Sequence, residues 1–245
     1  MSFHWKSNYL TTSIICLENT VKSIWLLIGR LKSKINPLLV IFRPRHIAQF
    51  EEAILKIKAD KLHINYFPQH IAYPLARIEF LKRKEYTHFV LITDDLIVTP
   101  KDYDLLKNEC ENYDVISGWG NNWLYGPWAE YSSVSFSMPP YPPSGGTIEG
   151  YNFTLIKELQ AMQGPIIPVP HQGTMLTFLK REIVERVPFR HDCGCCVDAL
   201  LSYDLAKEGI KQYVDLRVRM LHLKDSAIPV TLVGQRPSQI VYEPM

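Results

Sequence analysis

Short apolar runs alternate with amphipathic stretches through the first hundred residues of the chain. The apolar runs lie at 13–17, 37–42, 62–67 and 88–92, and apolar residues recur at helical spacing over 18–33, 46–59 and 73–84. Short apolar runs predict buried strands, and the longer periodic stretches predict helices. Strands that alternate with helices are typical of an α/β fold with a mostly parallel, doubly wound central sheet, which makes a three-layer α/β/α sandwich.

The middle of the chain has a different composition. Between Trp119 and Pro170, aromatic residues are interleaved with glycines, and a Pro-Pro-Tyr-Pro-Pro run spans 139–143. This composition interrupts helices, so we predict long ordered loops there rather than a second core. Aromatic side chains in long loops suit the stacking of a sugar. The alternative is a proline-rich excursion without a role in binding.

Regular structure resumes after this region. The pattern predicts a strand over 173–179, a short helix over 180–186 and an amphipathic helix over 198–208. Gly209 closes the last of these helices, because glycine commonly follows the final helical turn. Further strands are expected at 211–216 and 218–222, and the tail from Ile228 to Met245 gives no pattern. We interpret residues 1–245 as a single domain.

Composition and charge exclude several classes of function. The 27 Lys and Arg residues against 25 Asp and Glu leave a net charge of only +2, which provides no basic surface for nucleic acid. No apolar run approaches the roughly 20 residues of a transmembrane helix, and the first ten residues lack the apolar core of a signal peptide. We expect a soluble, cytoplasmic protein. The basic stretch at 22–34 is compatible with peripheral contact to a membrane surface, and a solvated helix face is the alternative.

The cysteines indicate reduced thiols. The chain holds Cys16, Cys110, Cys193, Cys195 and Cys196. An odd number of cysteines without a secretory signal favours a reducing compartment. The stretch 191–196 contains possible zinc ligands but lacks the paired spacing that tetrahedral zinc sites use. A tight loop around Gly194 is the alternative interpretation.

Two adjacent carboxylates, Asp94 and Asp95, directly follow Thr93 and the apolar run at 88–92. Ligand sites of open α/β sheets lie beyond the carboxyl ends of the strands. Buried carboxylates need a positive partner, and oxygen ligands prefer Mg²⁺ or Mn²⁺, which often bind a diphosphate at the same time. The pair therefore predicts a divalent metal site, with a helix or turn cap as the alternative. His222 is a candidate further ligand, with a structural role as its alternative.

The segment Tyr86–Leu96 resembles the hydrophobic strand and acidic metal motif of GT-A glycosyltransferases, especially the family 2-like group. Other segments resemble elements of the same family in the same order. They are Ala76-Arg77 (the Ala-Arg element facing the donor), 114–118 (the strand after the acidic motif), 173–184 (the acceptor-side strand and helix) and 197–222 (the Glu-Asp helix, its closing glycine and the terminal metal-binding histidine). The resemblance spans residues 13–224.

This resemblance implies a hexosyltransferase-like enzyme that moves a sugar from a nucleoside diphosphate donor to a hydroxyl of a glycan, a lipid-linked acceptor or a protein. It implies that 13–118 is the donor half of the domain, 119–172 a loop region, 173–224 the acceptor and catalytic half, and 225–245 a C-terminal tail. The implied cofactor is a divalent ion, Mn²⁺ or Mg²⁺.

The resemblance also assigns roles to individual residues. Arg77, Asp94 and Asp95 are expected at the donor diphosphate, and Asp94, Asp95 and His222 at the metal. Asp198 is expected to be the base that deprotonates the acceptor hydroxyl. Inversion of configuration is favoured because Asp198 matches a base rather than a nucleophile, and a retaining route stays open.

The chain departs from the family pattern at two places. The family motif has carboxylates at its first and third positions, whereas here Leu96 follows the pair, so either aspartate is a candidate metal ligand. The stretch Arg43-Pro44-Arg45 lacks the acidic residues that often contact the base and ribose, and Arg43 or Arg45 is a candidate phosphate ligand instead.

Two other functions are compatible with the fold. One is a carbohydrate-binding relative without turnover. The other is a sugar-phosphate nucleotidyltransferase, which is disfavoured because residues 17–20 do not form a glycine-rich phosphate loop.

Overall fold

The structure is a computed structural model, and it describes residues 34–126, 129–138, 152–190, 197–223 and 231–245. The chain divides into two compact units, 1–34 and 35–245. Apart from Lys34, all described residues belong to the second unit. The strand predicted at 13–17, the helix predicted at 18–33, the Pro-rich run at 139–143 and the cysteine-rich stretch at 191–196 all lie outside the described residues.

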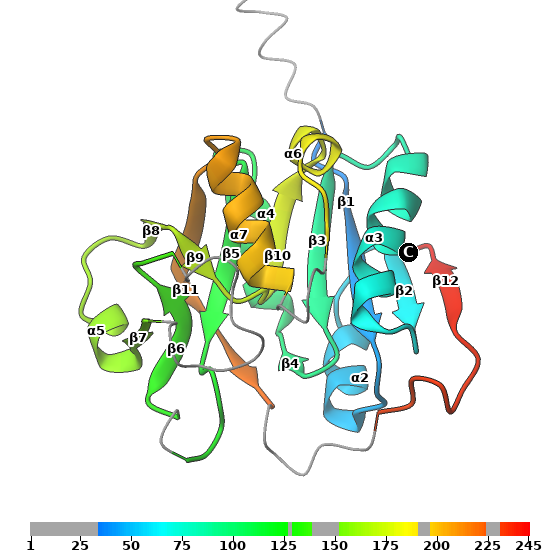
Figure 1. The fold of residues 1–245 in the computed structure, drawn as a ribbon, viewed down its shortest axis with the longest axis horizontal. Helices are drawn as coiled ribbons and strands as arrows, with labels where there is room; N and C mark the ends of the chain where they lie inside the picture. The colour runs from blue at the N-terminus through cyan, green and yellow to red at the C-terminus, as the bar shows by residue number, and fades with distance from the viewer. Residues whose placement is uncertain (1–33, 127–128, 139–151, 191–196, 224–230) are drawn as a thin grey trace, which may run out of the picture. The chain divides into compact units, whose positions relative to one another are not determined.

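A nine-stranded sheet forms the centre of the second unit (Figure 1). Its strands are β1 (Pro37–Arg43), β2 (Lys61–Asn65), β3 (His88–Thr93), β4 (Leu96–Ile97), β5 (Val115–Gly120), β8 (Ile166–Val169), β10 (Thr177–Lys180), β11 (Gln212–His222) and β12 (Gln239–Glu243). Their order across the sheet is β12-β2-β1-β3-β10-β5-β11-β4, and β8 pairs with β11 beside this path.

The sheet is mixed, so the prediction of a mostly parallel sheet was wrong. β1 is parallel to both β2 and β3, and β5 is parallel to β11. β10 lies antiparallel between β3 and β5, and β4, β8 and β12 also pair antiparallel. The first residue of β10, Thr177, pairs with Leu91 near the end of β3, so β10 enters the sheet at the edge where β3 leaves it. A parallel strand would have required a long crossover connection before it.

Helices cover both faces of the sheet (Figure 1). They are α2 (Ala48–Leu55), α3 (Gln69–Lys82), α4 (Pro100–Glu109), α6 (Arg181–Arg186) and α7 (Val197–Lys207). Leu38 and Val40 of β1 pack in one apolar cluster with α3, α6 and α7, whereas Leu39 and Ile41 pack in another with α2 and α4. Because successive side chains of a strand point to opposite faces, a strand covered on both sides needs a continuous apolar run. None of the described helices is both long and apolar enough to cross a membrane.

The region between 119 and 170 contains more regular structure than the sequence predicted. Its elements are β6 (Tyr131–Ser135), β7 (Phe153–Leu155), α5 (Ile156–Gln160) and β8, and β9 (His171–Gln172) follows. β7, β6 and β9 form a separate three-stranded sheet. Trp119 packs in a small apolar cluster with Val134, Leu159 and Val214, where we had predicted loops without a core of their own. Strands this short carry too few alternating residues to be recognised from the pattern.

The C-terminal tail, for which the sequence predicted nothing, provides the edge strand β12. Glu243 of β12 accepts from Lys61 Nζ at 3.1 Å, and its second oxygen lies 3.0 Å from His63 Nε2. Within β12 only Ile240 is partly buried and packs against the core, so the strand buries little apolar surface. Its place in the fold depends on β2 being available as a partner.

Gly120 allows β11 to approach β5 closely just before the residues that reach the cleft. A Cβ atom at Gly120 would lie 2.8 Å from the carbonyl oxygen of Met220 in β11, and that oxygen belongs to the backbone. We therefore expect Gly120→Ala to lower the free energy of unfolding by about 1–3 kcal/mol, measured by urea denaturation. A variant within about 0.5 kcal/mol of wild type would mean that the two strands lie further apart than described.

Candidate functional site

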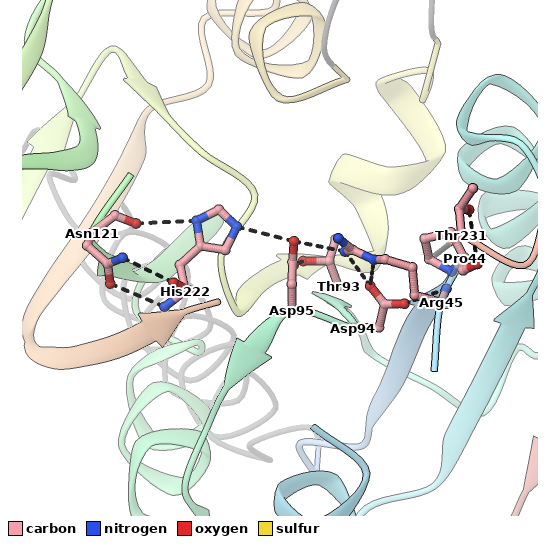
Figure 2. A network of polar contacts seen from close by, with 8 residues as sticks. All are labelled: Pro44, Arg45, Thr93, Asp94, Asp95, Asn121, His222 and Thr231. Atoms are coloured by element: carbon pink, nitrogen blue, oxygen red, sulfur yellow. Dashed lines mark hydrogen bonds and ion pairs between the residues drawn. The ribbon is translucent and has the colours of Figure 1, made fainter. Parts of the chain in front are cut away.

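The sheet places Arg45 beside the acidic pair. Asp94 and Asp95 follow β3, and Arg45 lies two residues after β1. Adjacent parallel strands end at the same edge of a sheet, and β1 and β3 are such a pair. The backbone N–H of Asp94 donates to the carbonyl of Phe42 in β1 at 3.0 Å, which fixes the two strand ends together. Figure 2 shows the resulting chain of polar contacts.

Arg45 engages both carboxylate oxygens of Asp94. Its backbone N–H donates to Oδ2 at 2.7 Å, and its Nε and Nη2 donate to Oδ1 at 3.0 and 2.6 Å. Asp94 is fully buried. Burial raises the pKa of the Asp94 carboxyl, and the charge and hydrogen bonds of Arg45 act against this rise. Asp94 therefore serves first as the partner that holds Arg45 in place.

Asp95 faces a different set of partners. Its Oδ2 lies 2.8 Å from Arg45 Nη2 and 3.3 Å from His222 Nε2, and its Oδ1 accepts from the Thr93 hydroxyl at 2.7 Å. Burial acts to raise the pKa of Asp95, but His222, Arg45 and Thr93 together outweigh it and hold the pKa well below its usual range. Asp95 is therefore a carboxylate that links Arg45 to His222 (Figure 2).

Asn121 holds His222 in position. The backbone N–H of His222 donates to Asn121 Oδ1 at 3.2 Å, and Asn121 Nδ2 donates to the His222 carbonyl at 3.1 Å. The ring Nδ1 lies 3.3 Å from the Asn121 carbonyl oxygen, and because a carbonyl only accepts, this contact places a proton on Nδ1. Nε2 is thereby directed at Asp95. Only its position directly after β5 marks Asn121 in the sequence, and no pattern there predicts its contact with His222.

A cleft of about 520 Å³ opens over this network, with walls from segments far apart in the sequence. The loop after β1, the start of α3, the residues around Gly173 and the start of α7 all contribute to it. The charged and aromatic side chains on its walls are Arg43, Arg45, Asp94, Asp95, Asp198, His222, Phe42, Phe67, Tyr73 and Phe153. The cleft therefore contains four of the five residues to which the resemblance assigned a role, Asp94, Asp95, Asp198 and His222, together with the candidate phosphate ligands Arg43 and Arg45.

Asp198 lies in the first turn of α7, on the wall of the cleft. One of its oxygens, Oδ1, accepts from the backbone N–H of Ala199 at 3.0 Å. A Cβ atom at Gly173 would lie 3.7 Å from the other oxygen, Oδ2, so the segment at Gly173 passes close to this carboxylate. Asp198 is partly exposed, which leaves its carboxylate accessible from the cleft.

Arg77, the fifth predicted site residue, does not line the cleft. Its Nε donates to the carbonyl of Val184 at 2.7 Å and its Nη2 to the carbonyl of Glu185 at 2.9 Å. These carbonyls belong to the last turn of α6, where helical partners are missing. Arg77 joins α3 to α6, and the arginine beside the acidic pair is Arg45.

Asp95 and His222 together are better placed to bind a divalent ion than Asp94 is. Asp95 Oδ2 and His222 Nε2 converge, and a histidine that donates its other ring N–H to a carbonyl is arranged as metal-bound histidines usually are. Both Asp94 oxygens already accept from Arg45. Within the described parts of the chain, no three His, Cys, Asp or Glu side chains group together as a metal site. An ion here would need further oxygen ligands from water or substrate, as Mg²⁺ commonly has.

Comparison with known proteins bears on the fold of the chain. No protein-family model matches the sequence, and no curated protein matches it. Among solved structures, "Crystal Structure of A197 from STIV" matches with a TM-score of 0.53 and 17% sequence identity, over 78% of this chain and 87% of that chain. At this identity the similarity concerns the fold alone. The chain thus has a mixed α/β fold that is similar to A197 over most of its length.

Proposed function

We propose that this protein is a GT-A-type glycosyltransferase that transfers a sugar from a nucleoside diphosphate donor to a hydroxyl acceptor. One observation carries the proposal: Asp94 and Asp95 after β3, Asp198 at the start of α7 and His222 at the end of β11 all line a single cleft. The sequence resemblance selected these residues by the order of their motifs. Their meeting at one edge of the sheet supports a common chemical role.

The cleft contains a candidate group for each step of this reaction. Asp95 and His222 would hold Mn²⁺ or Mg²⁺, and the bound ion would neutralise charge on the diphosphate leaving group. Asp198 accepts the proton of the acceptor hydroxyl as the oxygen forms its bond to the anomeric carbon. The bond between that carbon and the donor phosphate breaks, and its electron pair leaves with the diphosphate. Attack from the side opposite the leaving group inverts the configuration.

A non-catalytic carbohydrate-binding protein is the competing function. Asp198 favours the enzyme, because a partly exposed carboxylate in the same cleft as the acidic pair can accept a proton from a bound hydroxyl. Hydrolysis of a nucleotide sugar, with water as the acceptor, separates the two functions. An enzyme releases the nucleoside diphosphate from a bound donor, whereas a binding protein leaves the donor intact.

The proposal is tested by a thermal-shift screen of UDP, GDP, ADP, CDP and dTDP with and without Mn²⁺. A nucleotide at about ten times its Kd stabilises the native state by about 1.4 kcal/mol, which raises the Tm of a chain this long by roughly 3–6 °C. Asp95→Asn should reduce the shift, and Asp104→Asn, an exposed change on α4, should preserve it. The proposal fails when none of the nucleotides shifts the Tm under either condition.

A further inference from the structure

We propose that Arg45 binds the diphosphate of the donor and that Asp94 holds it in position to do so. This inference rests on the proposed function, since it names one contact of the ligand in that cleft. Arg45 lines the cleft and its side chain is 19% exposed, whereas Asp94 beneath it is fully buried. Arg45 is therefore accessible to a ligand in the cleft, whereas Asp94 is not and can only support Arg45.

The guanidinium of Arg45 has donors to spare. A guanidinium carries five N–H donors, and those on Nε and Nη2 reach Asp94 and Asp95. Nη1 has no hydrogen-bond partner among the described residues. Guanidinium groups bind phosphate oxygens through short, charge-assisted hydrogen bonds, often two at a time. Arg43 lines the same cleft, but it pairs with Glu51 at 2.9 Å and lies over the Phe50 ring, on the α2 side.

The loop that carries Arg45 is fixed before any ligand arrives. The Pro44 carbonyl accepts from the Leu232 backbone N–H at 2.8 Å. It also accepts from the Thr231 hydroxyl at 3.2 Å, a contact drawn in Figure 2. Asp94 holds the next residue, Arg45, through both its backbone and its side chain. A side chain that is already ordered loses little conformational entropy on binding, so more of the interaction energy appears as affinity.

Arg45 and a divalent ion would compete for the same carboxylate. Arg45 Nη2 and His222 Nε2 both contact Oδ2 of Asp95, so an ion at Asp95 and His222 would lie close to the guanidinium. Like charges repel, and an anionic diphosphate bound to both would remove the repulsion. Loss of Arg45 should therefore weaken diphosphate binding and strengthen the binding of Mn²⁺ alone. An arginine that only supports the fold would weaken both when removed.

The experiment measures binding of inorganic pyrophosphate and of Mn²⁺ to the full chain by titration calorimetry. Arg45→Gln should bind pyrophosphate about tenfold more weakly than wild type, because it loses charged hydrogen bonds. It should bind Mn²⁺ alone several-fold more tightly. Arg217→Gln is the matched control, because Arg217 also pairs with a fully buried aspartate, Asp215, but lies outside the cleft. It should leave both affinities at the wild-type value.

The outcomes separate this inference from the proposed function. Equal pyrophosphate affinities of wild type and Arg45→Gln, or a joint fall of pyrophosphate and Mn²⁺ affinity, overturn the inference. Arg45→Lys, which keeps the charge, provides a second variant should Arg45→Gln not fold, and an intermediate pyrophosphate affinity is expected for it. If nucleotides bind equally well to wild type and to Arg45→Gln, the proposed function stands and the inference about Arg45 is wrong. If pyrophosphate binding depends on Arg45 but no nucleotide binds, the role of Arg45 in phosphate binding stands and the proposed function falls. If neither ligand binds, both are overturned.

Discussion

Under the proposed function, Asp198→Asn is expected to lower the rate of donor turnover by about 10²–10⁴-fold, because an amide cannot accept the proton of the acceptor hydroxyl. The amide has the shape of the carboxylate, and its oxygen can still accept from the backbone N–H of Ala199. Affinity for the nucleoside diphosphate should therefore stay within about twofold of wild type. The rate is measured as release of nucleoside diphosphate from the nucleotide sugar, and the affinity by calorimetry.

Asp104→Asn provides the control for this variant. Asp104 is an exposed acid on α4 and does not line the cleft, so its loss should leave both the rate and the affinity unchanged. A rate for Asp198→Asn close to that of wild type would mean that another group takes the proton. A loss of affinity as large as the loss of rate would assign Asp198 to donor binding instead.

Asp94→Ala is expected to lower the free energy of unfolding by about 3–5 kcal/mol, measured by urea denaturation. Asp94 is fully buried and accepts from the backbone N–H, Nε and Nη2 of Arg45. Its removal leaves the Arg45 backbone N–H without its acceptor and a half-buried guanidinium with Asp95 alone. Because Arg45 keeps that partner, the lower end of the range is the expected value.

Asp114→Ala is the control, since it removes an aspartate from an exposed ion pair. Asp114 lies 2.9 Å from Lys180 Nζ and half of its side chain is exposed, so its loss should change stability by about 0–1 kcal/mol. The comparison also assigns the two aspartates of the acidic pair. An Asp94→Ala variant that stays stable but no longer binds Mn²⁺ would make Asp94 the metal ligand in place of Asp95.

The candidate site shows how far sequence reasoning reached. Asp94, Asp95 and His222 were selected first because they stand at the ends of apolar runs, and the motif order of the family resemblance then added Asp198. Arg77 was assigned by the resemblance as well, yet its guanidinium donates to carbonyls of α6. The direction of a long, flexible side chain depends on partners 107 and 108 residues away, which no local pattern contains.

Two contacts within the site also join residues that are far apart in the sequence. Arg45 stands 49 residues before Asp94, and Asn121 stands 101 residues before His222. Both pairs meet only because β1 lies beside β3 and β5 beside β11. The sequence left open which aspartate would bind a metal. The contacts favour Asp95, because Arg45 donates to both oxygens of Asp94, whereas His222 lies beside Asp95.

The sequence by itself determined the α/β class and the bounds of β1 and β3 to within one residue, whereas α3 begins four residues before the predicted helix. β1, β3 and α3 could be predicted because a strand buried on both faces needs a continuous apolar run and a covering helix needs an apolar stripe. Tertiary structure alone decided the antiparallel entry of β10, the addition of β12 and the small sheet of β6, β7 and β9. Strand direction and neighbour are chosen by pairing between distant segments, and the alternation of side chains along one strand is the same whichever partner it finds.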